Sequence, residues 1–382
     1  MNVVSLFSGI GGFELAFARH NHTTTMMCEI DPVARAVLQH HFPHTPVVEN
    51  VCDIEQLPAQ TDLLCAGFPC QDLSSIGIKK GLNGKRSSLV KEVFRILKAN
   101  PVEWVLIENV PYMLKLKGGQ AIRRITSELS AMGYSWAYRT IDSASFVPQK
   151  RCRVFVLASL HHDPKDVILS DDEPMVTFEQ MSDRLRAPIG FYWTEGRFAL
   201  GLMENGIPTL KAGSTIGIPS APAILMPNGS IGTPDIRDAE RLQGFPEDWT
   251  RCSERVARSS FRWRLVGNAV TVDTVAWIVN KIENPRPYDH SNDGDKVVLR
   301  HWPQAAWGTK GVRITANVTS HPCDRTRTDL RRFLNHRVKP LSLKAIQGFW
   351  NRLQAGTARS PEFFRHAVNN YLVQKEAENA NR

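Results

Sequence analysis

Short apolar runs alternate with segments of helical period along the first 160 residues. Residues 3–7 (Val-Val-Ser-Leu-Phe) fit a buried strand, and the apolar positions of residues 13–18 fit a helix. Further strand patterns lie at 23–28, 62–66, 104–107, 135–141 and 153–158, with helical patterns at 88–99 and 119–132. This alternation predicts an α/β domain in which successive strands can run parallel.

The alternation stops near residue 161, where proline and glycine become frequent. Residues 161–235 therefore predict a separate, loop-rich, partly β domain. A helix is expected near 235–242, and a final core helix at about 272–282 is expected to return to the first domain. We accordingly expect domains at 1–160 (completed by 261–282) and 161–260, followed by an extension at 283–382.

A glycine-rich turn, Ser8-Gly9-Ile10-Gly11-Gly12, joins the first strand to the first helix. Glycines at such a turn let a ligand approach the backbone and expose amide groups at a helix N-terminus, although similar turns also serve plain chain reversal. Glu29 follows the second strand, where an acidic residue binds a ribose diol. Asp31 is placed to cap a helix that begins at Pro32.

Two residues further along suggest contacts to a purine. Asp53 could accept from an exocyclic amine, and Ile54 could lie against the ring face. The alternative is an ordinary strand end, because an aspartate before an apolar residue is frequent there.

The apolar run of residues 62–66 ends at Gly67-Phe68-Pro69 and leaves Cys70 beyond it. Pro69 fixes its own φ and restricts Phe68 to extended conformations, so the loop that carries Cys70 begins in a defined geometry. Cys70 is a candidate nucleophile if its surroundings favour the thiolate. The alternative is a small residue of the hydrophobic core.

Glu108 ends the next predicted strand. If the two strands are parallel, Glu108 and Cys70 open on the same crevice, which would place an acid beside a nucleophile. A solvated residue or a helix cap is the alternative for Glu108. The glycine-rich, basic segment 74–86 is typical of a mobile phosphate-facing loop. Arg151 and Arg153 flank a cysteine at a strand start and suggest carboxylate or phosphate contacts.

Composition indicates a folded protein, since 42% of the 382 residues are hydrophobic. No apolar run reaches about eighteen residues and the N-terminal segment lacks signal-peptide features, so we expect a cytoplasmic protein without membrane association. The seven cysteines form an odd number and contain no Cys-x-x-Cys. This argues against a disulfide framework and a zinc site, and we expect reduced thiols and no metal.

The formal charge of +9 is unevenly distributed. Residues 1–282 contain 30 Lys and Arg against 29 Asp and Glu, whereas residues 283–382 contain 17 against 9. This excess in the last hundred residues suggests a polyanionic partner, and a solvated basic surface is the alternative.

Ordered motifs from Met1 to about Ile282 resemble the cytosine-5 DNA methyltransferases of bacterial restriction-modification systems. The motifs are Phe-Ser-Gly-Ile-Gly-Gly-Phe-Glu (7–14), Glu-Ile-Asp (29–31), Asp-Ile (53–54), Gly-Phe-Pro-Cys-Gln (67–71), Glu-Asn-Val (108–110), Gln-Lys-Arg-Cys-Arg (149–153), Arg-Leu-Gln-Gly-Phe-Pro (241–246) and Gly-Asn-Ala-Val (267–270). The resemblance implies a Rossmann-like, S-adenosylmethionine-dependent methyltransferase domain, a smaller target-recognition domain at 161–260, and a basic C-terminal extension.

The resemblance also implies the site. Cys70 would be the nucleophile, Glu108 the partner of the cytosine ring, and Arg153 a contact to Glu108 and the flipped base, with Arg151 in the same catalytic group. S-adenosylmethionine, released as S-adenosylhomocysteine, would be bound by Phe7, Gly9, Gly11, Glu29, Ile30, Asp53, Ile54, Pro69, Asn268 and Val270. Ala269 departs from relatives that carry serine there, so the resemblance implies that backbone amides replace a hydroxyl contact to the donor's carboxylate.

The implied reaction is methylation of carbon 5 of a flipped-out cytosine in double-stranded DNA, through a covalent Cys70 adduct at carbon 6. Glu108 must then hold or share a proton with cytosine N3, and the loop 74–86 would close over the base. The expected partners are DNA and a cognate restriction endonuclease, and the enzyme is expected to be monomeric. An RNA methyltransferase of the same fold and a catalytically silent DNA-binding regulator are the alternatives.

Overall fold

The computed structural model describes residues 1–69, 89–173, 185–214, 221–297, 302–323 and 328–381. Cys70 and the loop 74–86 lie outside these residues. The chain divides into two compact units, each built from separated segments. Unit 1 comprises Met1–Ser145, Cys152–Met175 and Val270–Asp324, and unit 2 comprises Phe146–Arg151, Val176–Ala269 and Arg325–Arg382.

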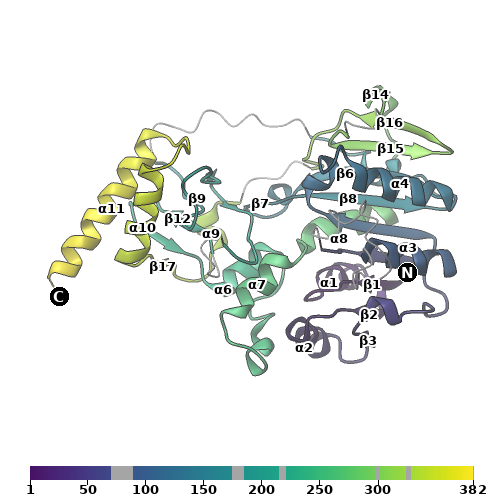
Figure 1. The fold of residues 1–382 in the computed structure, drawn as a ribbon, viewed down its shortest axis with the longest axis horizontal. Coiled ribbons are helices and arrows are strands. Elements are labelled where there is room, and N and C mark those ends of the chain that lie inside the picture. Colours follow the sequence, from purple (N-terminus) through teal and green to yellow (C-terminus); the bar gives the residue numbers. More distant parts are fainter. Residues whose placement is uncertain (70–88, 174–184, 215–220, 298–301, 324–327, 382) are drawn as a thin grey trace, which may run out of the picture. The chain divides into compact units, whose positions relative to one another are not determined.

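Unit 1 is organised around a ten-stranded sheet of order β14-β16-β15-β6-β8-β5-β4-β1-β2-β3 (Figure 1). Its N-terminal strands are β1 (Asn2–Leu6), β2 (Thr23–Cys28), β3 (Val47–Val48), β4 (Leu63–Ala66), β5 (Trp104–Asn109), β6 (Ser135–Asp142) and β8 (Cys152–Ser159). Strands β4 and β5 are parallel neighbours, with Ala66 opposite Ile107. The predicted α/β fold is thereby confirmed, and the segments that follow these two strands leave the same edge of the sheet.

Helices of unit 1 begin and end close to the positions that the pattern predicted. They are α1 (Gly12–Ala18), α2 (Pro32–His41), α3 (Leu89–Ala99), α4 (Gln120–Ala131), α5 (Lys165–Ile168) and α8 (Val272–Glu283), with short 3-10 turns η1 (Val51–Asp53), η3 (Pro111–Leu114), η4 (Ser143–Ser145) and η6 (His290–Asn292). Asp31 caps α2 as predicted, because its Oδ1 accepts from the amide of Val33 at 2.9 Å. Helix α8 returns to the first helix, and Arg19 pairs with Asp273 at 2.9 Å.

Residues 293–316 lengthen this sheet beyond β6. Strands β14 (Asp293–Lys296), β15 (Ala305–Thr309) and β16 (Val312–Ala316) are antiparallel, and β15 pairs with β6. Trp302 packs in the hydrophobic core of unit 1 and lies against Gly119. A Cβ atom at Gly119 would lie 2.1 Å from Cδ1 of Trp302. The expected extension at 283–382 is therefore divided: its first part belongs to unit 1 and residues from 325 onward belong to unit 2.

Unit 2 is loop-rich and partly β, as its proline and glycine content predicted. A five-stranded sheet has the order β10-β9-β12-β13-β17, and a two-stranded sheet pairs β11 with β7. The strands are β7 (Gln149–Lys150), β9 (Ile189–Phe191), β10 (Met203–Glu204), β11 (Ile207–Pro208), β12 (Ala223–Leu225), β13 (Ile231–Thr233) and β17 (Lys339–Pro340). The helices are α6 (Ile236–Leu242), α7 (Phe261–Asn268), α9 (Leu330–Phe333), α10 (Leu343–Gln354) and α11 (Glu362–Ala380), with a 3-10 turn η5 (Arg251–Arg255).

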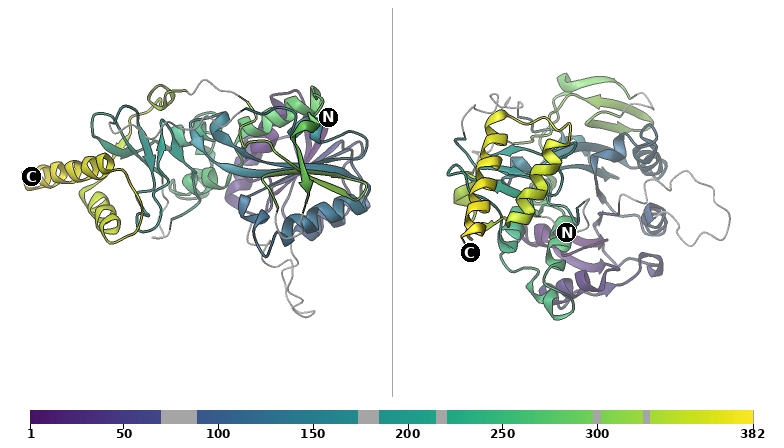
Figure 2. Two further views of the ribbon diagram at one scale, coloured as in Figure 1. Left: turned by 90° about the horizontal axis from the view of Figure 1, so that it is seen from above. Right: turned by 60° about the vertical axis from the view of Figure 1, so that its left-hand side comes forward.

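The C-terminal helices share a hydrophobic core with the five-stranded sheet. Figure 2 shows α10 and α11 side by side. The ring of Phe191 in β9 lies 5.1 Å from the ring of Phe349 in α10 and 5.1 Å from that of Phe364 in α11. Burial of such rings stabilises a fold by roughly 1.5–3 kcal/mol each, so these helices are integral to unit 2.

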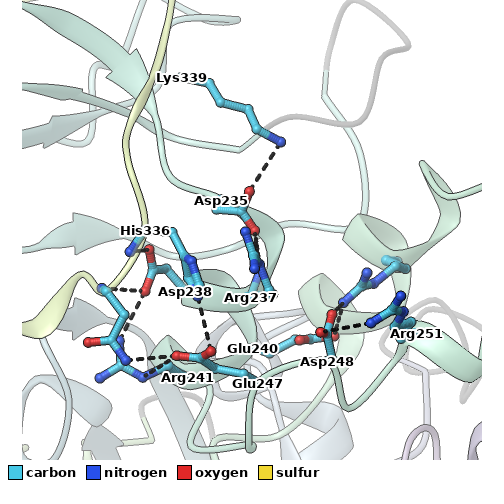
Figure 3. A network of polar contacts seen from close by, with 12 residues as sticks. Asp235, Arg237, Asp238, Glu240, Arg241, Glu247, Asp248, Arg251, His336 and Lys339 are labelled. Carbon is cyan, nitrogen blue, oxygen red and sulfur yellow. Dashed lines mark hydrogen bonds and ion pairs between the residues drawn. The ribbon is translucent and has the colours of Figure 1, made fainter.

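A polar network fixes the segment before β17 to helix α6 (Figure 3). The buried Asp238 accepts from the amides of Asn335 at 2.9 Å and His336 at 3.0 Å, and from Arg241 at 3.0 Å. Lys339 pairs with Asp235, the residue that caps α6, at 3.2 Å. A buried carboxylate needs such donors, so the C-terminal segment completes the polar environment of this helix.

No helix in the part of the chain that the structure describes combines the length and apolar character needed to cross a membrane. The six cysteines in these ranges are free thiols: Cys28, Cys52, Cys65, Cys152, Cys252 and Cys323.

Candidate active site

The turn after β1 adopts left-handed backbone conformations. Phe7, Gly9 and Gly11 have φ values of 60°, 57° and 89°. A Cβ at Gly11 would lie 2.7 Å from the ring of Phe42, so this position requires glycine. A Cβ at Gly9 would have no atom within 4 Å among the described residues, so the backbone there faces open space that a ligand can approach.

Glu29 is held beside this turn. Its Oε2 accepts from the amide of Gly9 and its Oε1 from the amide of Asp31, both at 2.8 Å. Burial raises the pKa of the Glu29 carboxyl, and these two amide hydrogen bonds offset part of that effect. The acidic residue predicted to face a ribose thus lies next to the glycine turn with a fixed orientation.

The two isoleucines of the predicted pocket differ in exposure. Ile30 is 70% exposed, and its carbonyl accepts from Arg35 at 2.9 Å, which holds the segment after β2. Ile54 is 3% exposed and packs in the main core. The proposed contact of Ile54 with a purine face stays a prediction. Asp53, the residue before Ile54, is exposed.

Asn109 anchors the backbone at Phe68, which precedes the predicted nucleophile Cys70 in the chain. It is buried, its Nδ2 donates to the carbonyl of Phe68 at 2.9 Å, and its Oδ1 accepts from the amide of Val110 at 2.9 Å. The ring of Phe68 meets that of Phe7 edge-on at 6.4 Å. Pro69 is exposed at the end of the described segment. The residue that follows it, Cys70, is therefore reached from a backbone anchored to the strand of Glu108.

Glu108 and Arg153 form an ion pair from neighbouring strands. Arg153 Nε lies 3.0 Å from Glu108 Oε1, and the two side chains are 16% and 13% exposed. A Cβ at Gly67 would lie 3.5 Å from Glu108 Oε2, and this oxygen has no hydrogen-bond partner among the described residues. The carboxyl thus has one oxygen oriented by Arg153 and a second available to a ligand beside the Gly67 backbone.

Arg151, the second arginine of the predicted catalytic group, is buried among backbone carbonyls. It belongs to unit 2, is 3% exposed, and donates to the carbonyls of Leu210 at 2.9 Å and Ala269 at 2.6 Å. A guanidinium directed at backbone carbonyls within a protein core holds those segments together. These contacts account for the burial of Arg151, and its place in the catalytic group stays a prediction.

Two buried glutamines that the sequence did not single out join the motifs of unit 2. Gln149 Nε2 donates to the carbonyl of Leu242 at 2.8 Å, and Gln243 Nε2 donates to the carbonyl of Val266 at 2.9 Å. A Cβ at Gly267 would lie 2.3 Å from the Lys211 carbonyl carbon, so the segments are in close contact. Both glutamines lie within the sequence motifs that carry the family resemblance, and this position was the signal in the sequence that could have identified them. Glutamines are rarely buried without hydrogen-bond partners.

The last two pocket candidates, Asn268 and Val270, are assigned to different units. Asn268 is exposed at the end of α7 in unit 2, whereas Val270 is buried at the start of the final segment of unit 1.

Glu14 is a buried acid in the first turn of α1, and its role is testable. Burial raises the pKa of its carboxyl above the ordinary value of 4.5. The folded state therefore binds the proton more tightly than the unfolded state, and stability is lost as pH rises through the folded pKa. We expect Glu14→Gln to raise the thermal midpoint relative to wild type by an amount that grows with pH above 4.5.

Thermal unfolding followed at several pH values measures this effect. Glu55→Gln, which changes an exposed carboxylate in the same unit, is the control and should give a small difference that is independent of pH. A difference between Glu14→Gln and wild type that does not vary with pH would contradict the assignment.

Comparisons with known proteins place these features in context. Residues 1–189 match the family model of C-5 cytosine-specific DNA methylases. The chain is 46% identical to the type II methyltransferase M2.BsuMI of Bacillus subtilis (strain 168), covering 92% of this chain and 93% of that protein. It is 28% identical to the type II methyltransferase M.MspI of Moraxella sp, covering 73% and 69% of the two chains.

Solved structures support the fold alone, because their identities are low. A Dnmt2 methyltransferase of S. pombe superposes with a TM-score of 0.56 at 20% identity, over 74% of this chain and 98% of that one. A putative DNA modification methyltransferase encoded within an E. coli prophage gives 0.51 at 18% identity, over 75% and 99%.

Proposed function

Because the chain belongs to the C-5 cytosine-specific DNA methyltransferases, we propose that it methylates a flipped-out cytosine within a specific double-stranded DNA sequence, using Cys70 and Glu108. Cytosine-5 DNA methyltransferase activity follows from the 46% identity over 92% of the chain. The observation that supports the proposed site is the Glu108–Arg153 pair, which leaves one carboxyl oxygen available beside the backbone that leads to Cys70.

The family uses S-adenosylmethionine, and the residues at the glycine turn fit that ligand. The open space at Gly9 admits a ligand to the backbone, while Glu29 offers a carboxylate to the ribose hydroxyls. We propose that Asp53, which is exposed, binds the adenine amine and that Ile54 lies at the adenine face, with Ile30 in the same pocket. We propose that Phe7, Gly11, Pro69 and Val270 complete the pocket in unit 1. When bound, S-adenosylmethionine supplies an electrophilic methyl group.

The protein's own task is to make carbon 5 of cytosine nucleophilic. Addition of the Cys70 thiolate to carbon 6 breaks the ring's aromaticity and directs electron density to carbon 5 and N3. Glu108 holds a proton at N3 and neutralises the charge that develops there, while Arg153 fixes the orientation of the carboxyl. After carbon 5 accepts the methyl group, a base takes the carbon 5 proton, the double bond between carbon 5 and carbon 6 re-forms, and the bond from carbon 6 to sulfur breaks, which regenerates the Cys70 thiolate.

Further proposals concern the setting of the reaction. The relatives are named type II methyltransferases, so we propose that this enzyme works in a restriction-modification system with an endonuclease that cuts the same sequence. We also propose that it acts as a cytoplasmic monomer without a metal ion. Unit 2 is the proposed reader of the target sequence, because base edges must be contacted from outside the catalytic unit.

Bisulfite sequencing of DNA from cells that express the protein tests this function. We expect protected cytosines at one position of one recurring sequence, and none at that position in cells with an empty vector. Parallel assays with matched DNA and RNA duplexes should label only the DNA. Protection scattered without sequence context, or label in the RNA alone, would contradict the proposal.

A further inference from the structure

Residues 192–200 form a closed loop on the five-stranded sheet of unit 2. It follows β9, and the amide of Tyr192 donates to the carbonyl of Leu200 at 2.8 Å. The hydroxyl of Tyr192 donates to the carbonyl of Thr209 at 2.9 Å, which anchors the base of the loop. At the tip, Phe198 is 82% exposed and Arg197 is also exposed. A fixed loop thus presents an aromatic ring and a cation to the solvent.

The C-terminal helices determine the shape of this loop. Arg352 of α10 donates through Nε to the carbonyl of Glu195 and through Nη2 to that of Trp193, both at 2.9 Å. The amides of Thr357 and Ala358 donate to the carbonyl of Arg197 at 2.7 and 3.1 Å. The backbone of the loop is therefore hydrogen-bonded along its length to residues 352–358.

Two glycines permit this close contact. Gly196 has a φ of 115°, and a Cβ there would lie 3.2 Å from the ring of Phe349. A Cβ at Gly356 would lie 2.4 Å from the carbonyl oxygen of Arg197. A left-handed conformation and such short distances are unfavourable for residues with a side chain. Glycine at these two positions therefore permits the contact that fixes the loop and leaves Phe198 exposed.

The segment that supports the loop has a positive net charge. Residues 341–382 contain 6 Lys and Arg against 3 Asp and Glu. Arg359, next to the Ala358 that holds the loop, is exposed. No carboxylate in the described ranges pairs with Arg197 or Arg359. An exposed aromatic ring with unpaired cations beside it is suited to a nucleic acid, which offers phosphates and base surfaces.

We propose that the loop 192–200, held by the C-terminal helices, is a DNA-contacting element in which Phe198 contacts base edges in a groove and Arg197 and Arg359 bind phosphates. This rests on the proposed function, since the DNA is the substrate duplex. It also assigns residues 341–382 the role of supporting this DNA-contacting loop. A protein partner is the competing occupant, and it predicts DNA binding that is unaffected by changes at the tip.

Equilibrium binding to a labelled duplex that contains the sequence found by bisulfite analysis tests the proposal, with S-adenosylhomocysteine present. Phe198→Ala should weaken binding about 10- to 150-fold, the effect of losing the burial of one Phe side chain, without changing its salt dependence. Arg197→Ala should lower the slope of log affinity against log salt by about one.

Control variants separate a contact from a folding effect. Val373→Ala removes another exposed apolar side chain of the same unit, which is 55% exposed on α11, and should bind like wild type. Phe198→Trp should bind like wild type, because it keeps an aromatic ring at the tip of the loop. Wild-type affinity and salt slope in both tip variants would overturn the proposal. Absence of methylation by the wild-type protein would instead reject the proposed function, so the two failures are distinguishable.

Discussion

Replacing Cys70 by alanine or serine is expected to abolish methyl transfer while DNA binding persists. Carbon 5 of cytosine is a poor nucleophile until a thiolate adds to carbon 6, and neither a methyl group nor a neutral hydroxyl can make that addition at a comparable rate. Removal of a covalent nucleophile typically lowers turnover by about 10³-fold or more. The affinity for duplex should change little, because phosphate contacts supply most of it.

Transfer of radioactive methyl groups to the target duplex measures the loss, and a gel-shift assay measures binding. With S-adenosylmethionine present, a duplex with 5-fluorocytosine at the target should trap the wild-type protein covalently and leave the Cys70 variants untrapped. Once carbon 5 is methylated, its fluorine cannot leave as a proton does, so the bond to Cys70 persists. Cys252→Ala, a half-buried thiol of unit 2, is the matched control and should retain activity and trapping. Methylation by a Cys70 variant at a near wild-type rate would refute the nucleophile assignment.

Local patterns predicted those parts of the structure that neighbouring residues determine. Asp31 followed by Pro32 specified a helix start, and the structure has the cap and the helix there. The apolar runs that end at Ala66 and Ile107 specified buried strands, and the parallel pairing of these strands places Gly67 beside Glu108. These features were predictable because side-chain periodicity, proline geometry and capping act over a few residues.

Long-range contacts could not be predicted in the same way. Arg151 finds its carbonyl partners 59 and 118 residues away, and an arginine in a motif does not reveal whether it meets a substrate or a backbone. Ile54 is predicted to lie at a ligand surface, and the sequence did not show that its side chain is buried in the core while that of Ile30 is exposed. The last hundred residues carried one compositional signal, their charge, but they contribute to both units, because strand pairing and core packing depend on surfaces that only the fold brings together.

Replacing Glu108 by glutamine should lower methyl transfer by roughly 10²–10⁴-fold, the usual contribution of a positioned acid. The amide keeps the size of the side chain but cannot hold a transferable proton at cytosine N3. Arg153→Gln should produce a smaller loss of about tenfold, the equivalent of about 1.4 kcal/mol, because it removes the charged partner that lies 3.0 Å from Oε1 and leaves the carboxyl in place.

These two variants can be separated by the step that they slow. In the absence of methyl donor, exchange of the carbon 5 proton of the target cytosine with solvent reports thiolate addition alone, and Glu108→Gln should lose this exchange because the charge at N3 is no longer neutralised. Arg153→Gln should keep exchange at a reduced rate, and Arg153→Lys, which retains a charge without the planar donor geometry, should fall between Arg153→Gln and wild type.

Lys98→Gln breaks an exposed ion pair of similar length, 2.9 Å to Glu128, and should leave exchange and methyl transfer unchanged. Exchange by Glu108→Gln at the wild-type rate would exclude Glu108 as the acid and leave the Arg153 pair with a purely structural role.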